Sequence, residues 1–354
     1  MKQNAFLLYG ANGYSGKLIA RFAGQYNLQP ILAGRNREAV AALANELQLS
    51  YQVADLTDAR SLAAIVSEVK LVVHAAGPYD VTARPMIDAC LAAGTHYIDL
   101  NGDLEVFEMI QGYDTAAKEK SCMLLPGAGF DVVPTDCLAR WLKNRLPDAD
   151  RLEIAFVIVG SGLSRGTSIT TLQRLGLPGA RRENGKIVAE PIGVRGKWVS
   201  FPPGKEKSFV MSIPWGDVST AYFSTGIPNI QTYTGIGKSV WIFLKAQRFY
   251  NWLLRTPLLH RLIKAIINSK SPGPGDERRD KAVSLIRAKV SNPAGTVMEA
   301  SMRCPEAYSL TAMSVLLIAQ KILAGEWKAG YQTPASAYGA DLIMEIPGVE
   351  RYAL

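Results

Sequence analysis

Residues 5–16 read Ala5-Phe6-Leu7-Leu8-Tyr9-Gly10-Ala11-Asn12-Gly13-Tyr14-Ser15-Gly16. The opening apolar run predicts a buried strand at 5–10, and the amphipathic residues after the turn predict a helix at 14–26. Gly10 permits a sharp turn, Gly13 lets the backbone approach a bound group, and Gly16 lets helix and strand pack closely. A strand, glycine turn and helix in this order predict the first unit of a parallel α/β sheet.

The same alternation continues from this stretch to about residue 125. Apolar runs predict strands at 29–34, 51–55, 70–75, 96–100 and 121–125, and amphipathic stretches predict helices at 37–48, 59–68, 81–94 and 103–119. The strands lack in/out alternation, which indicates burial on both faces by flanking helices. Residues 1–133 are therefore expected to form a doubly wound, Rossmann-type domain.

After Pro134 the texture of the sequence changes. Turns rich in glycine and proline separate β-type runs at Leu152–Val159, Lys186–Glu190, Ser208–Ile213 and Thr220–Phe223. They predict an inserted α+β domain over 134–306, built on an antiparallel sheet and serving substrate binding or oligomerisation. Residues 238–268 read as helical with a break near Pro257, and residues 281–290 and 296–303 as strands.

The tail is expected to complete the first domain with residues 307–354. Ser309 is placed to cap an apolar helix at 310–324, and a turn at 333–336 leads into a short helix. The apolar helix fits either an interdomain core or a homodimer contact, and both interpretations stay open.

Charge is unevenly distributed along the 354 residues. The net charge of +8 divides into −4 for residues 1–133, +13 for residues 134–306 and −1 for residues 307–354. The basic segment indicates an anionic partner such as a phosphorylated cofactor, an acyl carrier, a CoA ester or anionic lipid. Nucleic acid is not expected, because no motif for it accompanies the charge.

The cysteines and the hydropathy of the sequence indicate the cellular compartment. The four cysteines are scattered without a CxxC pair, which favours a reducing compartment, and no run of 18 apolar residues predicts a membrane-spanning helix. We expect a cytoplasmic protein with no metal site, since no cluster of ligand residues is present.

The glycine turn is typical of pyrophosphate binding. In this position, after a strand and before a helix, free amides at the helix start meet phosphate charge. The alternative is a strand–helix turn that needs glycine for its backbone conformation and binds no ligand. The five further βα units predicted after it favour dinucleotide binding instead. The residues expected to contact the phosphates are Gly10, Asn12, Gly13, Tyr14, Ser15 and Gly16.

The tip of the second predicted strand indicates the nucleotide. NAD-specific domains place an acid there, whereas this chain has Arg35, Asn36 and Arg37, and a guanidinium can fork onto a 2′-phosphate. We therefore expect NADP(H). Asp55 is placed to accept from the adenine amino group, and Ala76-Gly77-Pro78 to line the nicotinamide side.

Several catalytic classes are excluded by missing motifs. None of the 14 tyrosines has a lysine four residues later, so the short-chain dehydrogenase mechanism is out. No HExxH, P-loop lysine or GxSxG motif is present. The histidines at 74, 96 and 260 are scattered, and a strand histidine is more often a core residue than a catalyst.

Six stretches of the chain resemble the saccharopine dehydrogenase-like oxidoreductase family. They are Gly10 to Gly16, Ala33 to Asn36, Ala75 to Tyr79, His96 to Leu100, Pro126 to Asp136 and Thr333 to Gly339. The resemblance spans nearly the whole chain, and its branch of similar length includes trans-acting enoyl reductases of lipid synthesis. It implies a Rossmann domain completed by C-terminal residues, with an inserted α+β domain.

The working hypothesis is an NADPH-dependent oxidoreductase that reduces a C=C or C=N bond of an acyl or lipid-like substrate in an interdomain cleft. Tyr79 and Asp131 are the candidate proton donors, on loops facing the nicotinamide end; packing, helix capping or a hinge are the structural alternatives. Arg165 and Thr167 are the candidate substrate contacts. Saccharopine-type amino-acid reduction is less favoured, because a lone Arg165 offers few cationic contacts to a tricarboxylate.

Two further hypotheses remain open. The absence of an unmistakable acid/base pair motivates an NADP(H)-binding, lipid- or membrane-associated scaffold or sensor without turnover. Residues 238–270 hold seven Lys/Arg and no acid, interleaved with aromatics, and predict either a peripheral membrane contact or a packed helix pair with a solvated basic face.

Overall fold

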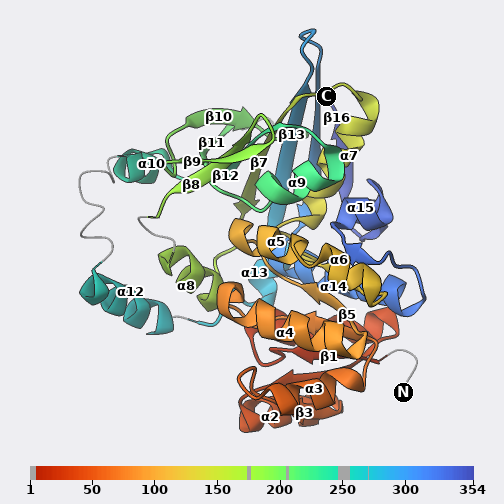
Figure 1. Ribbon diagram of the computed structural model, residues 1–354. Helices are drawn as coiled ribbons and strands as arrows, with labels where there is room; N and C mark the ends of the chain where they lie inside the picture. Colours follow the sequence, from red (N-terminus) through yellow and green to blue (C-terminus); the bar gives the residue numbers. More distant parts are fainter. Residues whose placement is uncertain (1–4, 174–176, 205–206, 246–255, 270) are drawn as a thin grey trace. The chain divides into compact units, whose positions relative to one another are not determined.

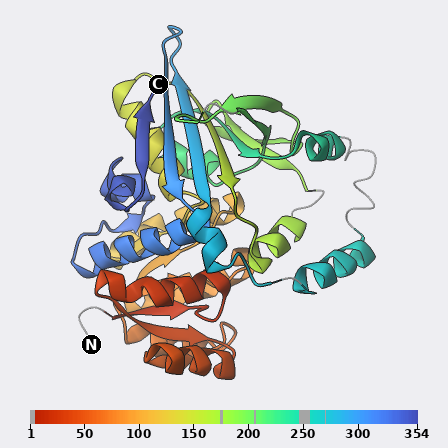
Figure 2. The same cartoon turned by 180° about the vertical axis from the view of Figure 1, so that it is seen from behind.

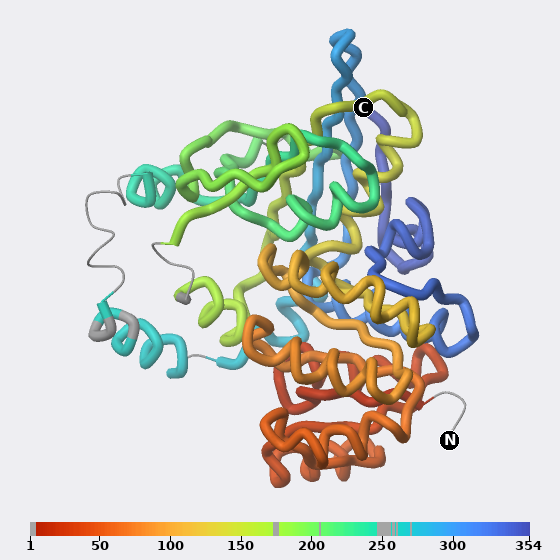
Figure 3. The backbone as a smooth tube through the Cα atoms, viewed as in Figure 1, coloured from red at the N-terminus to blue at the C-terminus, as the bar shows by residue number. Residues whose placement is uncertain are grey.

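The computed structural model describes the chain except residues 1–4, 174–176, 205–206, 246–255 and 270. The chain divides into two compact units, and each is discontinuous in sequence. Met1–Val133 joins Tyr308–Ile346 in the first unit, and Pro134–Ala307 joins Pro347–Leu354 in the second. Figure 3 traces how the chain leaves the first unit near residue 133 and re-enters it near residue 308.

The first unit is built on a seven-stranded parallel sheet of order β15-β6-β5-β4-β1-β2-β3. Its strands are β1 (Ala5–Tyr9), β2 (Gln29–Gly34), β3 (Tyr51–Val53), β4 (Leu71–His74), β5 (His96–Asp99), β6 (Met123–Leu125) and β15 (Gly330–Tyr331). The strand order reverses direction between β1 and β4, and this switch point is where open α/β sheets bind ligands. The Rossmann-type fold predicted from the sequence is confirmed.

Helices cover both faces of this sheet (Figure 1, Figure 2). They are α1 (Tyr14–Phe22), η1 (Ala23–Tyr26), α2 (Arg37–Leu47), α3 (Ala59–Ser67), α4 (Tyr79–Ala93), α5 (Leu104–Gln111), α6 (Asp114–Glu119), α14 (Ala307–Leu323), α15 (Pro334–Tyr338) and η3 (Leu342–Glu345). Side chains of α3, α4 and α5 pack on one face in a core that includes Leu7, Val72 and Tyr97. Figure 2 shows α1 and α14 together on the other face. The predicted helix 103–119 is two helices, because the chain turns at Gly112 and Tyr113.

The second unit is built on a mixed nine-stranded sheet. Its strands are β7 (Arg151–Val159), β8 (Gly179–Glu183), β9 (Lys186–Glu190), β10 (Gly196–Ser200), β11 (Lys207–Ser212), β12 (Asn229–Gly235), β13 (Val283–Ser291), β14 (Val297–Pro305) and β16 (Glu350–Ala353). Its described helices are α7 (Val133–Arg145), α8 (Arg165–Gln173), α9 (Asp217–Thr225), α10 (Lys238–Lys245), α12 (Pro257–Ser269) and α13 (Asp276–Lys281). A second, α+β unit is therefore present, as the sequence predicted.

Three details of the second unit differ from the sequence-based expectation. The run Thr220–Phe223 lies inside helix α9, which ends at Gly226 with a φ of +69°. Four residues are too few to separate a strand from a buried helical turn. The sheet is not wholly antiparallel, because β12 pairs in parallel with β7.

The third difference concerns the tail. The sequence placed all of residues 307–354 with the first domain, whereas Pro347–Leu354 falls in the second unit. The reason is the strand β16, which pairs antiparallel with β14. Among the described residues, no helix has both the length and the apolarity that a membrane crossing requires.

Candidate cofactor-binding and active site

Three glycines shape the turn between β1 and α1, because a side chain at any of them would lie close to neighbouring atoms. Gly10 has a φ of +88°, and a Cβ there would lie 2.7 Å from the Ala75 carbonyl carbon. A Cβ on Gly16 would lie 2.4 Å from the Gly10 oxygen. At Gly13 the nearest atom to such a Cβ is the Gly10 oxygen at 3.2 Å, so Gly13 is less crowded. Gly10 and Gly16 therefore leave no room for a side chain, and Gly13 leaves little.

The start of α1 retains its capacity to bind an anion. Its N-cap is Gly13, which has no side chain to cap the first amides, and the first turn carries no acidic residue. The Gly13 amide itself donates to the Gly10 carbonyl at 3.0 Å. Uncapped amides at a helix N-terminus, together with the positive end of the helix dipole, favour a phosphate.

The structure brings the other predicted nucleotide residues to this same sheet edge. The amides of Gly10 and Ala11 both donate to the Ala33 carbonyl at the end of β2. The Asn12 side-chain oxygen lies 3.3 Å from where a Cβ on Gly34 would be. Ala76 approaches the turn from the end of β4, since its Cβ lies 2.8 Å from the Cβ position of Gly10. The carboxyl ends of β1, β2 and β4 therefore enclose one small region.

Arg35, Asn36 and Asp55 lie at the tips of β2 and β3 with different local roles. Asn36 caps α2, because its Oδ1 accepts the Ala39 amide at 3.0 Å. Asp55 Oδ1 accepts both the amide and the hydroxyl of Thr57, at 2.9 and 2.8 Å. These hydrogen bonds, with a smaller contribution from the Arg35 charge, lower the pKa of Asp55. Arg35 is exposed beside that carboxylate.

Tyr14 and Ser15 lie in the first turn of α1, and both are half-buried. The Tyr14 ring packs edge-on against Tyr308 with 4.9 Å between centroids. Tyr308 begins the second pass of the chain through this unit. The rim of the turn is thus supported by a residue almost 300 positions away in the sequence.

Tyr79 is the first residue of α4, whereas the sequence placed it on a loop before a helix starting at residue 81. Its hydroxyl donates to the His74 carbonyl at 3.2 Å. Burial raises the pKa of Tyr79 well above its ordinary value, and the nearby carboxylates of Asp99 and Asp131 raise it further. The hydroxyl is therefore a weak acid already committed to a main-chain acceptor. Gly77 and Pro78 immediately before it are exposed.

Asp131 lies on the segment between β6 and α7 and is half-buried. Its Oδ2 lies 2.5 Å from the position that a Cβ on Gly102 would take, so a side chain at residue 102 would require the carboxyl to move. Burial raises the pKa of Asp131 to about 7, and the neighbouring Asp103 carboxylate adds to the rise. Among the two predicted proton donors, Asp131 has the pKa suited to proton transfer near neutrality.

Asp99 at the end of β5 holds the segment that carries Asp131. Its Oδ1 accepts the amides of Asn101 and Gly127 at 2.9 and 2.8 Å, and its main-chain oxygen accepts the Ala128 amide at 2.8 Å. From the other side, Ser314 Oγ donates to the Ala128 carbonyl at 2.8 Å, and the Phe130 amide donates to Thr311 Oγ1 at 3.0 Å. The segment is thereby clamped between β5 and α14.

A buried polar group lies behind Asp99. The Tyr97 hydroxyl donates to Asp99 Oδ2 at 2.7 Å and lies 3.1 Å from His74 Nδ1, and all three residues are fully buried. Burial raises the pKa of Asp99 to about 6 and lowers that of His74 to about 3. Sequence reasoning assigned Asp99 no role, and the available signal was an acid ending an otherwise buried strand.

Arg165 and Thr167 belong to the second unit, at the start of α8. The Arg165 amide donates to the Pro272 carbonyl at 2.8 Å. Ser164 Oγ accepts the Thr167 amide at 3.2 Å and lies 3.0 Å from its hydroxyl, so these residues form a helix cap. Thr167 thus has a local structural role in addition to the predicted one.

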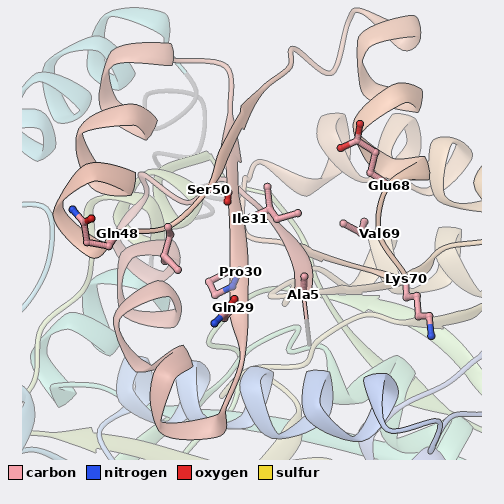
Figure 4. Close-up of a pocket in the computed structure, with 10 residues that line it drawn as sticks. Ala5, Gln29, Pro30, Ile31, Gln48, Ser50, Glu68, Val69 and Lys70 are labelled. Atoms are coloured by element: carbon pink, nitrogen blue, oxygen red, sulfur yellow. The ribbon is translucent and has the colours of Figure 1, made fainter. Parts of the chain in front are cut away.

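A pocket of about 650 Å³ lies at the opposite end of the first sheet (Figure 4). Its lining includes Ala5 of β1, Gln29 and Ile31 of β2, Ser50 and Lys70. These residues sit at the amino ends of the strands, and none of them is a predicted site residue. Parallel sheets bind their ligands at the carboxyl ends, which sets this pocket apart from the glycine turn.

Comparison with known proteins supports the cofactor class. Residues 6–125 match the family model described as the saccharopine dehydrogenase NADP binding domain. That match covers every strand from β1 to β6 and confirms both the resemblance read from the sequence and the expected NADP(H).

Similar proteins carry two kinds of oxidoreductase name. A Mycobacterium tuberculosis protein, named provisionally as a trans-acting enoyl reductase, is 32% identical over 194 residues, which are 50% of this chain and 46% of that relative. The Bos taurus saccharopine dehydrogenase-like oxidoreductase is 23% identical over 176 residues, covering 44% of this chain and 41% of its own. The chain thus spans less than half the length of these relatives.

One solved structure shares the fold over essentially the whole chain. The Saccharomyces cerevisiae saccharopine dehydrogenase (L-Glu forming) superposes with a TM-score of 0.71, covering 99% of this chain and 100% of that one. The identity is 13%, so the likeness concerns the fold.

Proposed function

We propose, because residues 6–125 match the family model of the saccharopine dehydrogenase NADP-binding domain, that this chain is an NADPH-dependent oxidoreductase acting on a small molecule. The substrate we propose is acyl or lipid-like and carries a C=C or C=N bond. The observation that carries the proposal is the glycine turn, where Gly10 and Gly16 admit no side chain and the first amides of α1 have no side-chain cap. A turn built in this way favours a diphosphate.

Arg35 is proposed to select NADPH over NADH. It is exposed at the tip of β2, where a guanidinium can bind a 2′-phosphate through two hydrogen bonds. We expect Arg35→Ala to weaken NADPH binding by about tenfold or more, which corresponds to about 1.4 kcal/mol, and to leave NADH binding nearly unchanged. Arg21→Ala, at an exposed position in the last turn of α1, is the matched control and is expected to bind NADPH like the original chain.

Asp131 is proposed to supply the proton of the reduction. When bound, NADPH supplies a hydride to one atom of the double bond, and the other atom then needs a proton. The Asp131 carboxyl, with a pKa of about 7, is substantially protonated at neutral pH and can donate it. Tyr79 is proposed to pack beside Asp131 without donating a proton, since the Tyr79 hydroxyl already donates a hydrogen bond to the His74 carbonyl.

NADPH consumption tests this proposal directly. The full chain is incubated with NADPH and a panel of enoyl thioesters, free enoyl acids and imines of aldehydes with amino acids, and the loss of NADPH absorbance is followed. We expect consumption with one class, and only a small fraction of that rate with Asp131→Asn. Tight NADPH binding without consumption by any substrate would instead favour an NADP(H)-binding scaffold or sensor. That candidate is supported by the Tyr79 hydroxyl, which donates to the His74 carbonyl rather than pointing a proton at a substrate. Failure to bind either nicotinamide dinucleotide at millimolar concentration would overturn the proposal.

A further inference from the structure

We propose that the exposed side of α12 is a docking surface for an anionic phospholipid bilayer. The five apolar residues of α12 that support this surface recur at helical spacing along one side: Leu259, Leu262, Ile263, Ile266 and Ile267. Helix α12 packs against α8 (Figure 1), and Leu259, Ile263 and Ile267 on this side are half-buried. The rest faces outward, since Leu262 is 56% exposed and Ile266 is 58% exposed. Two large aliphatic side chains one turn apart are therefore left in solvent.

The polar side of α12 is basic. Arg261 and Lys264 are exposed and lie opposite the apolar side, together with Asn268, and residues 257–269 contain no acid. A helix with aliphatic residues on one side and cations on the other is suited to lie in the plane of a membrane interface. There the aliphatic side chains enter the acyl boundary while the cations reach lipid headgroups.

Helix α10 also exposes apolar side chains close to cations, although it lacks the two-sided pattern of α12. Trp241 anchors it to the second unit, since its Nε1 donates to the Gly193 carbonyl at 2.7 Å and its ring lies 4.9 Å from that of Phe209. On other sides of the helix, Val240 is 48% exposed and Ile242 is 57% exposed. A helix that is apolar on all sides is usually buried, so this one lacks part of its expected cover. Exposed Lys238 and Lys245 flank it.

Charge identifies the occupant as an anionic surface. Helices α10 and α12 carry four exposed cations, Lys238, Lys245, Arg261 and Lys264, and no Asp or Glu; the other three Lys/Arg of residues 238–270 lie outside the described residues. A second copy of this chain on the same surface would bring like charges together, which is unfavourable. A bilayer containing anionic headgroups satisfies both the cations and the apolar side chains.

The test is sedimentation of the full chain with vesicles of phosphatidylcholine alone or with one quarter phosphatidylserine. We expect more protein to sediment with the anionic vesicles, and less as salt increases. Leu262→Asn with Ile266→Asn is expected to reduce partitioning by at least about tenfold. Arg261→Gln with Lys264→Gln is expected to reduce it about fivefold per cation removed, on the anionic vesicles only.

Two control variants, one double and one single, make the same kinds of change elsewhere on the second unit. Lys186→Gln with Lys207→Gln removes the same two charges from exposed positions, and Val297→Asn removes an aliphatic residue that is 47% exposed. Both are expected to partition like the original chain. NADPH titration of every variant keeps this result separate from the proposed enzymatic function, which it does not depend on.

Two outcomes would overturn the proposal. One is equal partitioning of the original chain and both α12 variants on anionic vesicles. The other is a dimer in sedimentation equilibrium that Leu262→Asn with Ile266→Asn dissociates while vesicle binding is absent, because the surface would then contact a second copy.

Discussion

At the residue scale, the glycine turn makes a prediction that separates steric need from mere tolerance. A Cβ on Gly16 would lie 2.4 Å from the Gly10 oxygen, whereas a Cβ on Gly24 would meet nothing within 4 Å. We expect Gly16→Ala to cost about 1–3 kcal/mol of stability through overpacking and to weaken NADPH binding more than about tenfold. Gly24→Ala is expected to change neither. Thermal unfolding and fluorescence titration measure the two effects, and NADPH binding to Gly16→Ala at the original affinity would contradict the assignment.

Replacing Asp131 and replacing Tyr79 are expected to affect the pH dependence of the rate differently. The pKa of Asp131 is raised to about 7, so its carboxyl is protonated below that pH and ionised above it. If Asp131 donates the proton, kcat/KM for a substrate that supports NADPH consumption falls as pH rises through about 7. We expect Asp131→Asn to abolish that descent together with most of the rate. Tyr79→Phe should keep the descent at the same pH, because the pKa of Tyr79 lies well above its ordinary value.

The same pKa makes Asp131 a stability switch whose sign can be worked out. Its folded pKa of about 7 lies above the ordinary value of about 4, so folding favours the protonated form. The corresponding stability is present below about pH 4 and is lost as pH rises through about 7. Urea unfolding across this range should therefore show a weaker pH dependence for Asp131→Asn. An unchanged dependence would contradict the raised pKa.

At the element scale, the contact between α14 and the segment after β6 is the feature to test. Thr311 Oγ1 accepts the buried Phe130 amide, and Thr311→Val keeps the shape while removing the acceptor. An unsatisfied buried amide costs about 1–3 kcal/mol, and we expect that loss in urea unfolding together with a lower kcat. Ser67→Ala removes an exposed hydroxyl that bonds to Ala64 within α3, and it should change stability little. Equal losses in the two variants would show that the α14 contact has no special weight.

Elements of the first unit were predictable because their signals are local. The expected strands at 5–10, 29–34 and 96–100 correspond to β1, β2 and β5 within one residue at each end. Apolar runs between helical stretches suffice there, since both faces of a parallel sheet are buried. In the second unit the signal is weaker: Thr220–Phe223 has strand-like residues, but Gly226 ends a helix there. Strand β15 has two residues, and only its pairing with β6 defines it.

Within the candidate site, the glycine turn between a strand and a helix could be predicted from the sequence, because it depends on neighbouring residues. The roles of Arg35 and Asp131 stay predictions. The clamp on Asp131 could not be predicted, since Asp99, Gly127 and Thr311 come together only through the tertiary fold. The close approach of the Asp131 carboxyl to Gly102 likewise depends on the tertiary fold and could not be predicted from the sequence.

At the scale of the whole molecule, the discontinuous first unit predicts how cofactor binding is felt along the chain. Gly330 and Gln332 donate main-chain hydrogen bonds to Cys122 and Leu124, and Ser314 bonds to Ala128, so residues 308–346 share the core of the dinucleotide-binding unit. A ligand at 100 times its Kd stabilises the unit that binds it by about 2.7 kcal/mol. That stabilisation should reach α14 and β15 although both lie about 300 residues beyond the glycine turn.

Hydrogen exchange measured by mass spectrometry on the full chain, with and without NADPH, tests this coupling. We expect peptides from α14 and β15 to gain protection alongside those from β1 and α1, because elements of one cooperative unit open together. Gly16→Ala in the presence of NADPH is the control, since it should bind the cofactor poorly and gain nothing at either place. Protection confined to residues 5–26 would mean that the glycine turn responds locally, and that the second pass of the chain through this unit is not thermodynamically part of the cofactor-binding domain.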